Sequence, residues 1–504
     1  MAEPSSKKAK TEAVADFGVF GMGTMGQNLA LNISERGYRL AAYNRPDEFQ
    51  ARIWGALERA KEEGEARGKT ILIDAHTELA DFVASLKTPR RILLSIPSGK
   101  PVDMTLEALK PLLSAGDVVI DGGNENFKNT ERRSKEMLES HGIHFMGMGI
   151  SGGEVGARNG PALMPGGTRE SWEHVKEVLE AMSAKAGDVP EEAPCVTWVG
   201  PGGSGHYVKM VHNGIEYADM QFIAEAYDLM QNVCGFTNDE MASVFDRWNN
   251  GRLASYLFEI TAEILLKKDD QPGCEGFLLD QILDQAGNKG TGKWTVQEAA
   301  DVGVAVPCVS AALEARFTSA QKDLRSKCAE LYRGKVGVDD LPLATPMSDY
   351  DKEQLVVDLE KALFAAKIVA YAQGLSQIQA ASDEYKWGVK LSELTRIWRG
   401  GCIIRAKILN DISDALKTNP DLESLLLDEG LASELAEASD GLRAIVVKAV
   451  ANGLSAPGFS GALAYFDGMR RGRCSANMIQ AQRDFFGAHT FKRLDKEGAY
   501  HAAW

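Results

Sequence analysis

The chain has 504 residues, of which 44% are hydrophobic and 25% charged, and a formal net charge of −15 at pH 7. This composition is typical of a globular protein of about two to four domains, and the acidic balance argues against nucleic acid as a partner, because phosphate backbones require a basic surface. Every apolar run is shorter than the ~18 residues of a membrane-spanning helix, and the 7 cysteines have neither disulfide nor zinc spacing. We therefore expect a soluble, cytoplasmic protein with no membrane association and no metal site.

The N-terminal part of the chain has the pattern of an α/β domain. Residues 1–15 lack the apolar segment of a signal peptide and are expected to form a disordered extension. A βαβ opening follows, with a strand at 17–20, a glycine turn, a helix at 25–36 and a strand at 39–43. Further strands are expected at 71–73, 92–95, 118–120, 144–146 and 196–199, with helical periodicity between them. This alternation predicts a doubly wound, mostly parallel sheet, so we assign residues 16–202 to a Rossmann domain.

Strand signals almost vanish in the second part of the chain. Residues 207–232 form a long helical pattern that is apolar on most sides, which is typical of a buried helix. Further helices are expected at 239–248, 253–268, 309–330, 352–379, 391–416 and 432–451. We therefore predict a large all-helical domain at 203–471. The remaining tail, residues 472–504, is rich in aromatic residues and is expected to dock on its own domain or on a partner, because disordered segments are poor in such residues.

A glycine turn is the first motif with a chemical meaning. It lies between the first strand and the first helix and reads Gly21-Met22-Gly23-Thr24-Met25-Gly26. The first glycine allows the tight turn, the second lets the backbone approach a pyrophosphate, and the third lets the helix pack on the strand. Such a turn alone could merely join two elements. With strand, helix and second strand in place, it predicts a dinucleotide site whose anion binds at the helix N-terminus.

The end of the second strand indicates which dinucleotide is bound. An NAD site would place Asp or Glu there to bind the ribose 2′-hydroxyl group. This chain has Asn44, Arg45 and Pro46 instead. Because an arginine attracts a 2′-phosphate that a carboxylate would repel, the sequence favours NADP.

Polar residues recur at two further loops and on the long helix. The loops Asp121–Asn124 and Ser151–Gly153 follow strands, where α/β sheets bind ligands, although each could be an ordinary turn. On the helix, Lys209, Asn213 and Glu216 fall within about 60° of one another, and His212 adjoins them. Lys209 and Glu216 are about 10.5 Å apart along the helix axis. A small polar ligand between them explains this spacing better than an internal ion pair.

Together these motifs resemble a known enzyme family. The patterns G-x-G-x-M-G-x-x-x-A, D-G-G-N, S-G-G and K-x-x-H-N-x-x-E-Y are similar to those of the long-chain, decarboxylating 6-phosphogluconate dehydrogenases, within the β-hydroxyacid dehydrogenases. The blocks Lys289–Trp294 and Arg483–His489 and the helical setting of Arg316 agree, so the resemblance covers roughly residues 17–495. It departs at Pro46, where the family usually has threonine, and at the loop 93–99, which lacks the family's lysine. How strictly NADP is preferred over NAD is therefore left open.

The resemblance implies an activity and roles for individual residues. The activity is the NADP-dependent conversion of 6-phospho-D-gluconate to D-ribulose 5-phosphate, CO₂ and NADPH, in the oxidative pentose phosphate pathway and in gluconate utilization. Lys209 would be the general base and Glu216 the acid, with Asn213 beside them. The cofactor would contact the glycine turn and Asn44, Arg45, Pro46, Ser95, Ile96, Pro97 and Asn124. The substrate would contact Asn124, Ser151, Gly152, Gly153, His212, Asn213, Tyr217, Lys289, Thr291, Arg316, Arg483 and His489.

The resemblance also implies a homodimer. In the family the residues that correspond to Arg483 and His489 reach across from the other subunit, so we expect the C-terminal tail to complete the neighbouring active site. Two alternatives remain open from the sequence: another β-hydroxyacid dehydrogenase, and a catalytically silent NADP-binding sensor. The presence of both Lys209 and Glu216 favours an enzyme over a sensor.

Overall fold

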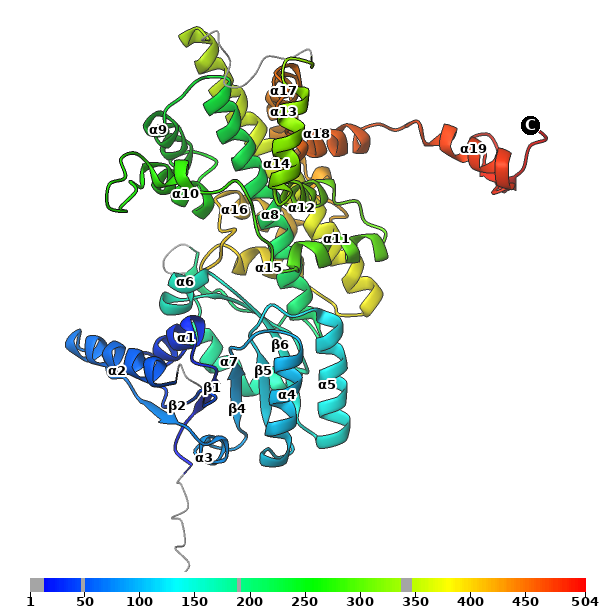
Figure 1. The fold of residues 1–504 in the computed structure, drawn as a ribbon. Coiled ribbons are helices and arrows are strands. Elements are labelled where there is room, and N and C mark those ends of the chain that lie inside the picture. The colour runs from blue at the N-terminus through cyan, green and yellow to red at the C-terminus, as the bar shows by residue number, and fades with distance from the viewer. Residues whose placement is uncertain (1–12, 47–49, 188–191, 337–346) are drawn as a thin grey trace, which may run out of the picture.

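The computed structural model describes residues 13–46, 50–187, 192–336 and 347–504. A sheet domain, a helical domain and a projecting C-terminal tail follow one another along the chain (Figure 1). Most of the expected N-terminal extension lies outside the described residues. Its last two residues belong to the fold instead, because the backbone N–H groups of Val14 and Ala15 donate to the carbonyl oxygen of Ser85 and Ala15 is buried. Among the helices within the described ranges, none combines the length and the apolar character that crossing a membrane requires.

A 7-stranded sheet forms the first domain. Its strands are β1 (Phe17–Phe20), β2 (Leu40–Tyr43), β3 (Ile73–His76), β4 (Arg91–Leu94), β5 (Val118–Asp121), β6 (His144–Ser151) and β7 (Ala162–Pro165). They lie in the order β3-β2-β1-β4-β5-β6-β7, and every neighbouring pair is parallel except β6 with β7. The predicted doubly wound, mostly parallel sheet is confirmed. The strand order reverses between β1 and β4, which opens a ligand crevice at the carboxyl ends of these strands.

Helices cover both faces of this sheet. They are α1 (Thr24–Ser34), α2 (Gln50–Ala66), α3 (Leu79–Ala84), α4 (Lys100–Leu109), α5 (Phe127–His141), α6 (Gly153–Asn159) and α7 (Arg169–Met182), and a short hairpin of β8 (Lys185–Ala186) and β9 (Ala193–Pro194) follows. Because successive strand residues point to opposite faces, Val19 and Leu93 enter the core under α1 and α7, whereas Phe20 and Leu94 enter the core under α3, α4 and α5. Burial on both faces explains why these strands are almost continuously apolar.

The prediction of a last strand at 196–199 was wrong. This segment runs beside β7 without forming a regular strand, and isolated bridges join Leu163 to Val196 and Gly166 to Gly200. The strand that pairs with β6 at this edge of the sheet is β7 instead.

The second domain is helical, as predicted, and is built around two long buried helices. It contains α8 (Ser204–Asn232), α9 (Asn238–Asn249), α10 (Tyr256–Leu266), α11 (Thr291–Asp301), α12 (Pro307–Ser319), α13 (Lys322–Tyr332), α14 (Asp349–Tyr385), α15 (Leu391–Ile397), α16 (Ile408–Thr418), α17 (Glu429–Ala451) and α18 (Pro457–Met469). Helices α8 and α14 pack side by side, and Lys367 of α14 pairs with Asp219 of α8 in the core at 2.5 Å. Two predicted helices are divided: 309–330 into α12 and α13, and 391–416 into α15 and α16. The second break contains Gly401, whose positive φ of 63° ends the helical path.

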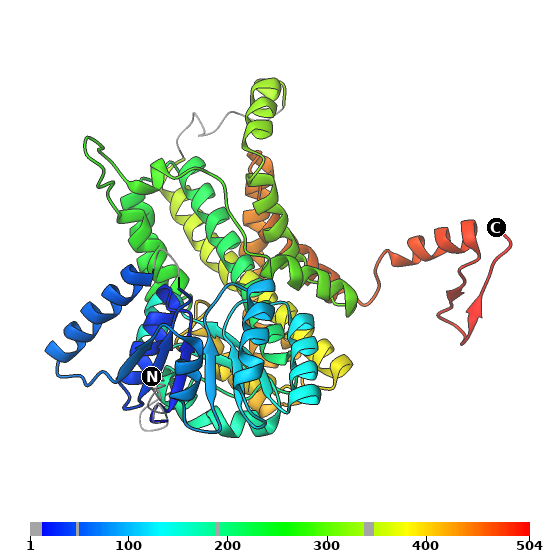
Figure 2. The same cartoon turned by 60° about the horizontal axis from the view of Figure 1, so that its bottom comes forward.

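The C-terminal tail projects away from the helical domain beyond α18 in both views (Figures 1 and 2). It contains α19 (Ala476–Gly487) and a small hairpin of β10 (Phe491–Lys492) and β11 (Ala499–Tyr500). The carboxylate of Asp484 organises this unit, since it accepts hydrogen bonds from the backbone of Thr490 and Ala502 and from the side chains of His501 and Trp504. The tail is thus a folded unit that stands apart from the rest of its own chain.

Candidate active site

Lys209, His212, Asn213 and Glu216 form a polar stripe on α8. The stripe begins where this helix passes the carboxyl end of β6. The approach is very close: a Cβ atom on Gly149 of β6 would lie 2.3 Å from Cβ of Lys209. A Cβ atom on Gly147 would lie 2.6 Å from Nδ1 of His206, whose ring hydrogen-bonds the hydroxyl of Thr130 and the carbonyl oxygen of Asp121. The two glycines therefore let α8 lie against the sheet and bring Lys209 to the ligand crevice.

Lys209 is buried beside an imidazole. Its Nζ lies 3.4 Å from Nδ1 of His212, whose Nε2 lies 3.2 Å from the hydroxyl of Ser151. Burial lowers the pKa of the Lys209 ammonium, although the Glu216 carboxylate opposes the shift. Burial also lowers the pKa of His212 well below its usual value, and Lys209 adds to this effect. The surroundings therefore favour a neutral amine that can accept a proton.

Glu216 forms the other end of the stripe. One of its carboxylate oxygens lies 3.9 Å from Nδ1 of His212, so this imidazole stands between the lysine and the glutamate. Burial raises the pKa of the Glu216 carboxyl, against the opposing effects of Lys209 and Arg316. A base with a lowered pKa and an acid with a raised pKa thus lie on one helix, which is the arrangement that general acid–base chemistry near neutral pH requires.

Further predicted substrate residues surround the stripe. Asn213 donates from Nδ2 to the hydroxyl of Thr291, the first residue of α11, at 3.3 Å. Arg316 of α12 places its guanidinium 3.5 Å from the centre of the Tyr217 ring and donates to the carbonyl oxygen of Gly287. Lys289 lies exposed in the loop before α11. These residues give the end of the site beyond Glu216 a positive character that suits an anionic group.

The loop Ser151–Gly153 lies between α8 and the segment after α15. Gly152 has a φ of 117°, and a Cβ atom there would lie 2.5 Å from the carbonyl oxygen of Gly401. The hydroxyl of Ser151 also accepts a hydrogen bond from the backbone N–H of Ile403, and the Trp398 ring meets the His212 ring edge-on at 5.6 Å. The segment after α15 therefore supports the site, which the sequence analysis missed. The paired glycines 400 and 401 inside a helical pattern were the available signal.

The glycine turn of β1 and α1 has the shape that a dinucleotide needs. Gly21 has a φ of 96°, and a Cβ atom there would lie 2.5 Å from the carbonyl oxygen of Ser95. A Cβ atom on Gly23 would meet nothing within 4 Å, so this side of the turn is open to a ligand. Asn44 steadies the turn by accepting a hydrogen bond from the backbone N–H of Met22, and Arg45 beside it is exposed. The residues present fit NADP, because the open turn at the N-terminus of α1 suits a pyrophosphate and the exposed Arg45 suits a 2′-phosphate.

Comparison with known proteins identifies the family. The model described as "6-phosphogluconate dehydrogenase, C-terminal domain" matches residues 205–504, and "NAD binding domain of 6-phosphogluconate dehydrogenase" matches residues 16–200. The chain belongs to the 6-phosphogluconate dehydrogenase family. The resemblance seen in the sequence is thereby confirmed.

Individual members of the 6-phosphogluconate dehydrogenase family match along nearly the whole chain. A rice protein, "6-phosphogluconate dehydrogenase, decarboxylating 1", is 47% identical over 492 residues, which cover 98% of each sequence. A Bacillus subtilis protein named "6-phosphogluconate dehydrogenase, NADP(+)-dependent, decarboxylating" is 48% identical over 488 residues, 97% of this chain and 98% of its own. Among solved structures, Plasmodium falciparum 6-phosphogluconate dehydrogenase, described with NADP+ and with 6-phosphogluconate, matches with a TM-score of 0.88 and 43% identity, over 97% of this chain and 100% of its own.

Two groups of predicted substrate residues lie outside the cluster around α8. Asn124 is exposed at the carboxyl end of β5, beside the crevice. Arg483 and His489 lie in the tail, which projects away from α8 of the same chain (Figure 2). There Arg483 donates to Gln480, and His489 packs against Phe486. A single chain therefore assembles the stripe without these two residues.

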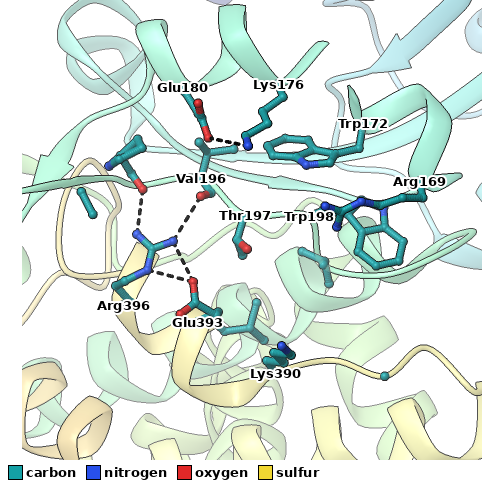
Figure 3. A pocket seen from close by; sticks show the side chains of 15 residues that line it. Arg169, Trp172, Lys176, Glu180, Val196, Thr197, Trp198, Lys390, Glu393 and Arg396 are labelled. Atoms are coloured by element: carbon teal, nitrogen blue, oxygen red, sulfur yellow. Dashed lines mark hydrogen bonds and ion pairs between the residues drawn. The ribbon is translucent and has the colours of Figure 1, made fainter. Parts of the chain in front are cut away.

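A cavity of about 530 Å³ lies elsewhere, between the two domains, and most of its charged groups are paired within the protein. Figure 3 shows it between α7, residues 193–199 and α15. Arg396 pairs with Glu393 and also donates to two backbone carbonyl oxygens, while Lys176 faces Glu180 at 3.9 Å. Because most of these groups are paired and the lining residues do not come from α8, this cavity is a weaker candidate for the active site than the stripe.

Proposed function

We propose that this chain is an NADP-dependent 6-phosphogluconate dehydrogenase that converts 6-phospho-D-gluconate to D-ribulose 5-phosphate, CO₂ and NADPH. The observation that carries this proposal is the stripe of α8, on which Lys209 and Glu216 have pKa values shifted toward each other. Family membership supports it, since the matched relatives are named as decarboxylating and, in Bacillus subtilis, as NADP(+)-dependent.

Lys209 is the general base of the first step. As neutral amine it takes the proton of the C3 hydroxyl while the hydride leaves C3 of the substrate. NADP, when bound, accepts that hydride at its nicotinamide ring. The lysine is then an ammonium next to the new C3 ketone, where it polarises the carbonyl oxygen and so stabilises the electron pair that remains when the carboxylate leaves as CO₂.

Glu216 is the acid of the last step. Loss of CO₂ leaves an enediol, which becomes the product ketose when its C1 carbon is protonated. A carboxyl group whose pKa is raised by burial holds a proton close to neutral pH and can donate it there. His212, between the two groups, keeps Lys209 and Glu216 oriented through contacts of 3.4 and 3.9 Å.

The three parts of the chain have separate tasks in this proposal. Residues 16–202 bind NADP, residues 203–471 hold the sugar acid, and the tail 472–504 completes the site of the other subunit in a homodimer. The phosphate of the substrate binds to Tyr217, Lys289, Thr291 and Arg316, and to Arg483 and His489 of the partner subunit. The tail supports a dimer because Met478, Ile479, Phe485 and Phe486 are between 60% and 72% exposed on it, and such apolar surface marks a protein interface.

The proposal is tested by following NADPH formation with purified full-length protein. We expect turnover with 6-phosphogluconate and NADP, release of CO₂, and loss of hydride transfer in Lys209→Met, because methionine cannot accept the C3 proton. The matched control is Lys367→Met, which removes another buried lysine of the same domain but lies in the α8–α14 core. NADP-dependent turnover of a different hydroxyacid, with none of 6-phosphogluconate, would contradict the proposal.

A further inference from the structure

A buried ion pair lies behind the loop that connects β4 to α4. Glu125 follows β5, and Arg133 lies one and a half turns into α5; both are 4% exposed or less. Nη1 of Arg133 donates to Glu125 at 2.6 Å, and the rest of its guanidinium binds both carboxylate oxygens of Asp103 on α4. The pair therefore joins three segments that are far apart in the sequence.

The same pair binds both the backbone N–H and the carbonyl oxygen of Gly99 in that loop. Gly99 is the N-cap of α4 and, as glycine, has no side chain with which to cap the helix. The Glu125 carboxylate accepts the Gly99 N–H at 2.7 Å, and Arg133 donates to the Gly99 carbonyl oxygen at 2.9 Å. Gly99 has a φ of 82°, a conformation that is open to glycine and that most residues avoid, so these contacts select one backbone shape of a flexible residue.

The loop that this pair binds, residues 95–99, faces the cofactor crevice. Ser95, at its start, donates its backbone N–H to the carbonyl oxygen of Phe20, and a Cβ atom on Gly21 would lie 2.5 Å from the carbonyl oxygen of Ser95. The loop therefore abuts the glycine turn directly. On the other side, Glu125 is adjacent in sequence to Asn124, another residue that we expect to contact NADP. Two cofactor-facing segments thus share one anchor.

Both members of the pair are charged in the folded protein. Burial alone raises the pKa of the Glu125 carboxyl, but hydrogen bonds from Asn129 and Arg133 outweigh it, so that its pKa lies below the usual value. Burying two charges recovers little net stability even when they are well paired. The geometry of the loop, more than stability, is what this pair provides.

We propose that Glu125 and Arg133 are positioning residues that set the loop Ser95–Gly99 against the glycine turn and so determine the affinity for NADP. This inference rests on the proposed function, because it takes NADP as the ligand of the crevice. It does not depend on the identity of the sugar acid.

The test is NADP binding, measured by calorimetry on full-length protein without substrate. In Glu125→Gln the side chain keeps its size but loses the charge. One amide oxygen then replaces two carboxylate oxygens, and the amide nitrogen faces either the donors Gly99 and Arg133 or the donors Asn126 and Asn129. We expect the Kd for NADP to rise about tenfold, as for loss of one charge-assisted contact. In the steady state, KM for NADP should rise by a similar factor while kcat at saturating NADP changes less than about threefold.

The matched control is Asp117→Asn. Asp117 is also buried, pairs with an arginine, Arg90, and accepts backbone N–H groups, but it lies at the opposite ends of the same strands. Both variants should lower the thermal midpoint, whereas the control should keep the Kd for NADP within about twofold of the parent. Equal Kd values for Glu125→Gln and Asp117→Asn would overturn the inference.

Two further variants cover the remaining outcomes. If Glu125→Gln does not fold, Asp103→Asn replaces it. Asp103 is 39% exposed, and this substitution alters only the outer partner of Arg133. An unchanged Kd for NADP in Asp103→Asn overturns the inference, and a rise of about threefold supports it. Arg133→Lys, which keeps the charge but not the second donor to Gly99, should give an intermediate Kd.

A parent protein that binds no NADP would overturn both this inference and the proposed function, whereas one that binds NADP but leaves 6-phosphogluconate unchanged would overturn the proposed function alone.

Discussion

Arg45 is the residue on which the choice of cofactor depends. It is exposed at the carboxyl end of β2, next to Asn44, which is hydrogen-bonded to the glycine turn. We predict that Arg45→Glu lowers kcat/KM for NADP by two or more decades, since ~3 kcal/mol is reasonable when a charge-assisted contact becomes repulsion. Parallel assays with NAD provide the control, because NAD lacks the 2′-phosphate. An equal loss with both cofactors would show that Arg45 acts on the fold of the turn and not on that phosphate.

The opposed pKa shifts of Lys209 and Glu216 predict a bell-shaped pH profile. The base must be deprotonated, so kcat/KM should fall at acid pH, and the acid must be protonated, so it should fall at alkaline pH. Glu216→Gln removes the second requirement. We therefore expect this variant to bind the substrate, to turn over far more slowly and to lose the alkaline limb while it keeps the acid limb. The full profile of parent and variant decides this, and an unchanged rate and profile would make Glu216 a structural residue.

At the scale of elements, two helices of the second domain begin in the same way and are capped by different side chains. Helices α12 and α18 both start with proline, and a central helix supplies the cap of each. Gln373 of α14 accepts the backbone N–H of Cys308, whereas Glu225 of α8 accepts those of Gly458 and Phe459. Only the second cap can carry a charge, and this difference has a measurable effect on stability.

Glu225 should make stability depend on pH. Burial raises the pKa of its carboxyl to about 7 from the ordinary value of 4.5, despite its hydrogen bonds. The folded state therefore binds the proton more tightly than the unfolded state, so the contribution of this group is complete below pH 4.5 and is lost as the pH rises through about 7. The loss is on the order of 3 kcal/mol. In Glu225→Gln, which imitates the cap of α12, we expect thermal unfolding to show a smaller fall in midpoint between about pH 5 and pH 7.5 than in the parent. The same fall in both proteins would exclude Glu225 as its source.

The elements that the sequence predicted best are those with local signals. The βαβ opening and the long helix α8 follow from periodicity and from the spacing of three glycines, and the stripe on α8 follows from helix geometry alone. The division of 391–416 was missed because Gly400 and Gly401 end a helix only where their backbone meets another segment, here Gly160 and Gly152. The anchor of Glu125 and Arg133 was missed for a similar reason: its contacts to Gly99 span 26 and 34 residues, and no pattern along the chain indicates which strands become neighbours.

At the scale of the whole molecule, the tail is folded but has no cover from its own chain in the described residues. Asp484 joins α19 to the last residues of the chain, while Phe485 and Phe486 remain largely exposed on the outside of that helix. A preassembled unit loses less conformational entropy when it binds than a disordered segment does. The tail is therefore suited to dock on a second copy of the chain, as the proposed dimer requires.

Mixing two inactive variants tests whether the tail completes the site of the partner. Lys209→Met and Arg483→Ala should each be nearly inactive as homodimers, and each should still bind NADP, because the glycine turn is intact in both. If the site is shared, refolding them together yields heterodimers in which the intact Lys209 of one chain meets the intact Arg483 of the other. One site of the two then works, and activity is recovered on mixing. If instead both residues serve the same chain, every chain in the mixture keeps one defect and no activity returns. Subunit exchange must be demonstrated with differently tagged chains, since only then does a lack of recovery contradict the crossed tail.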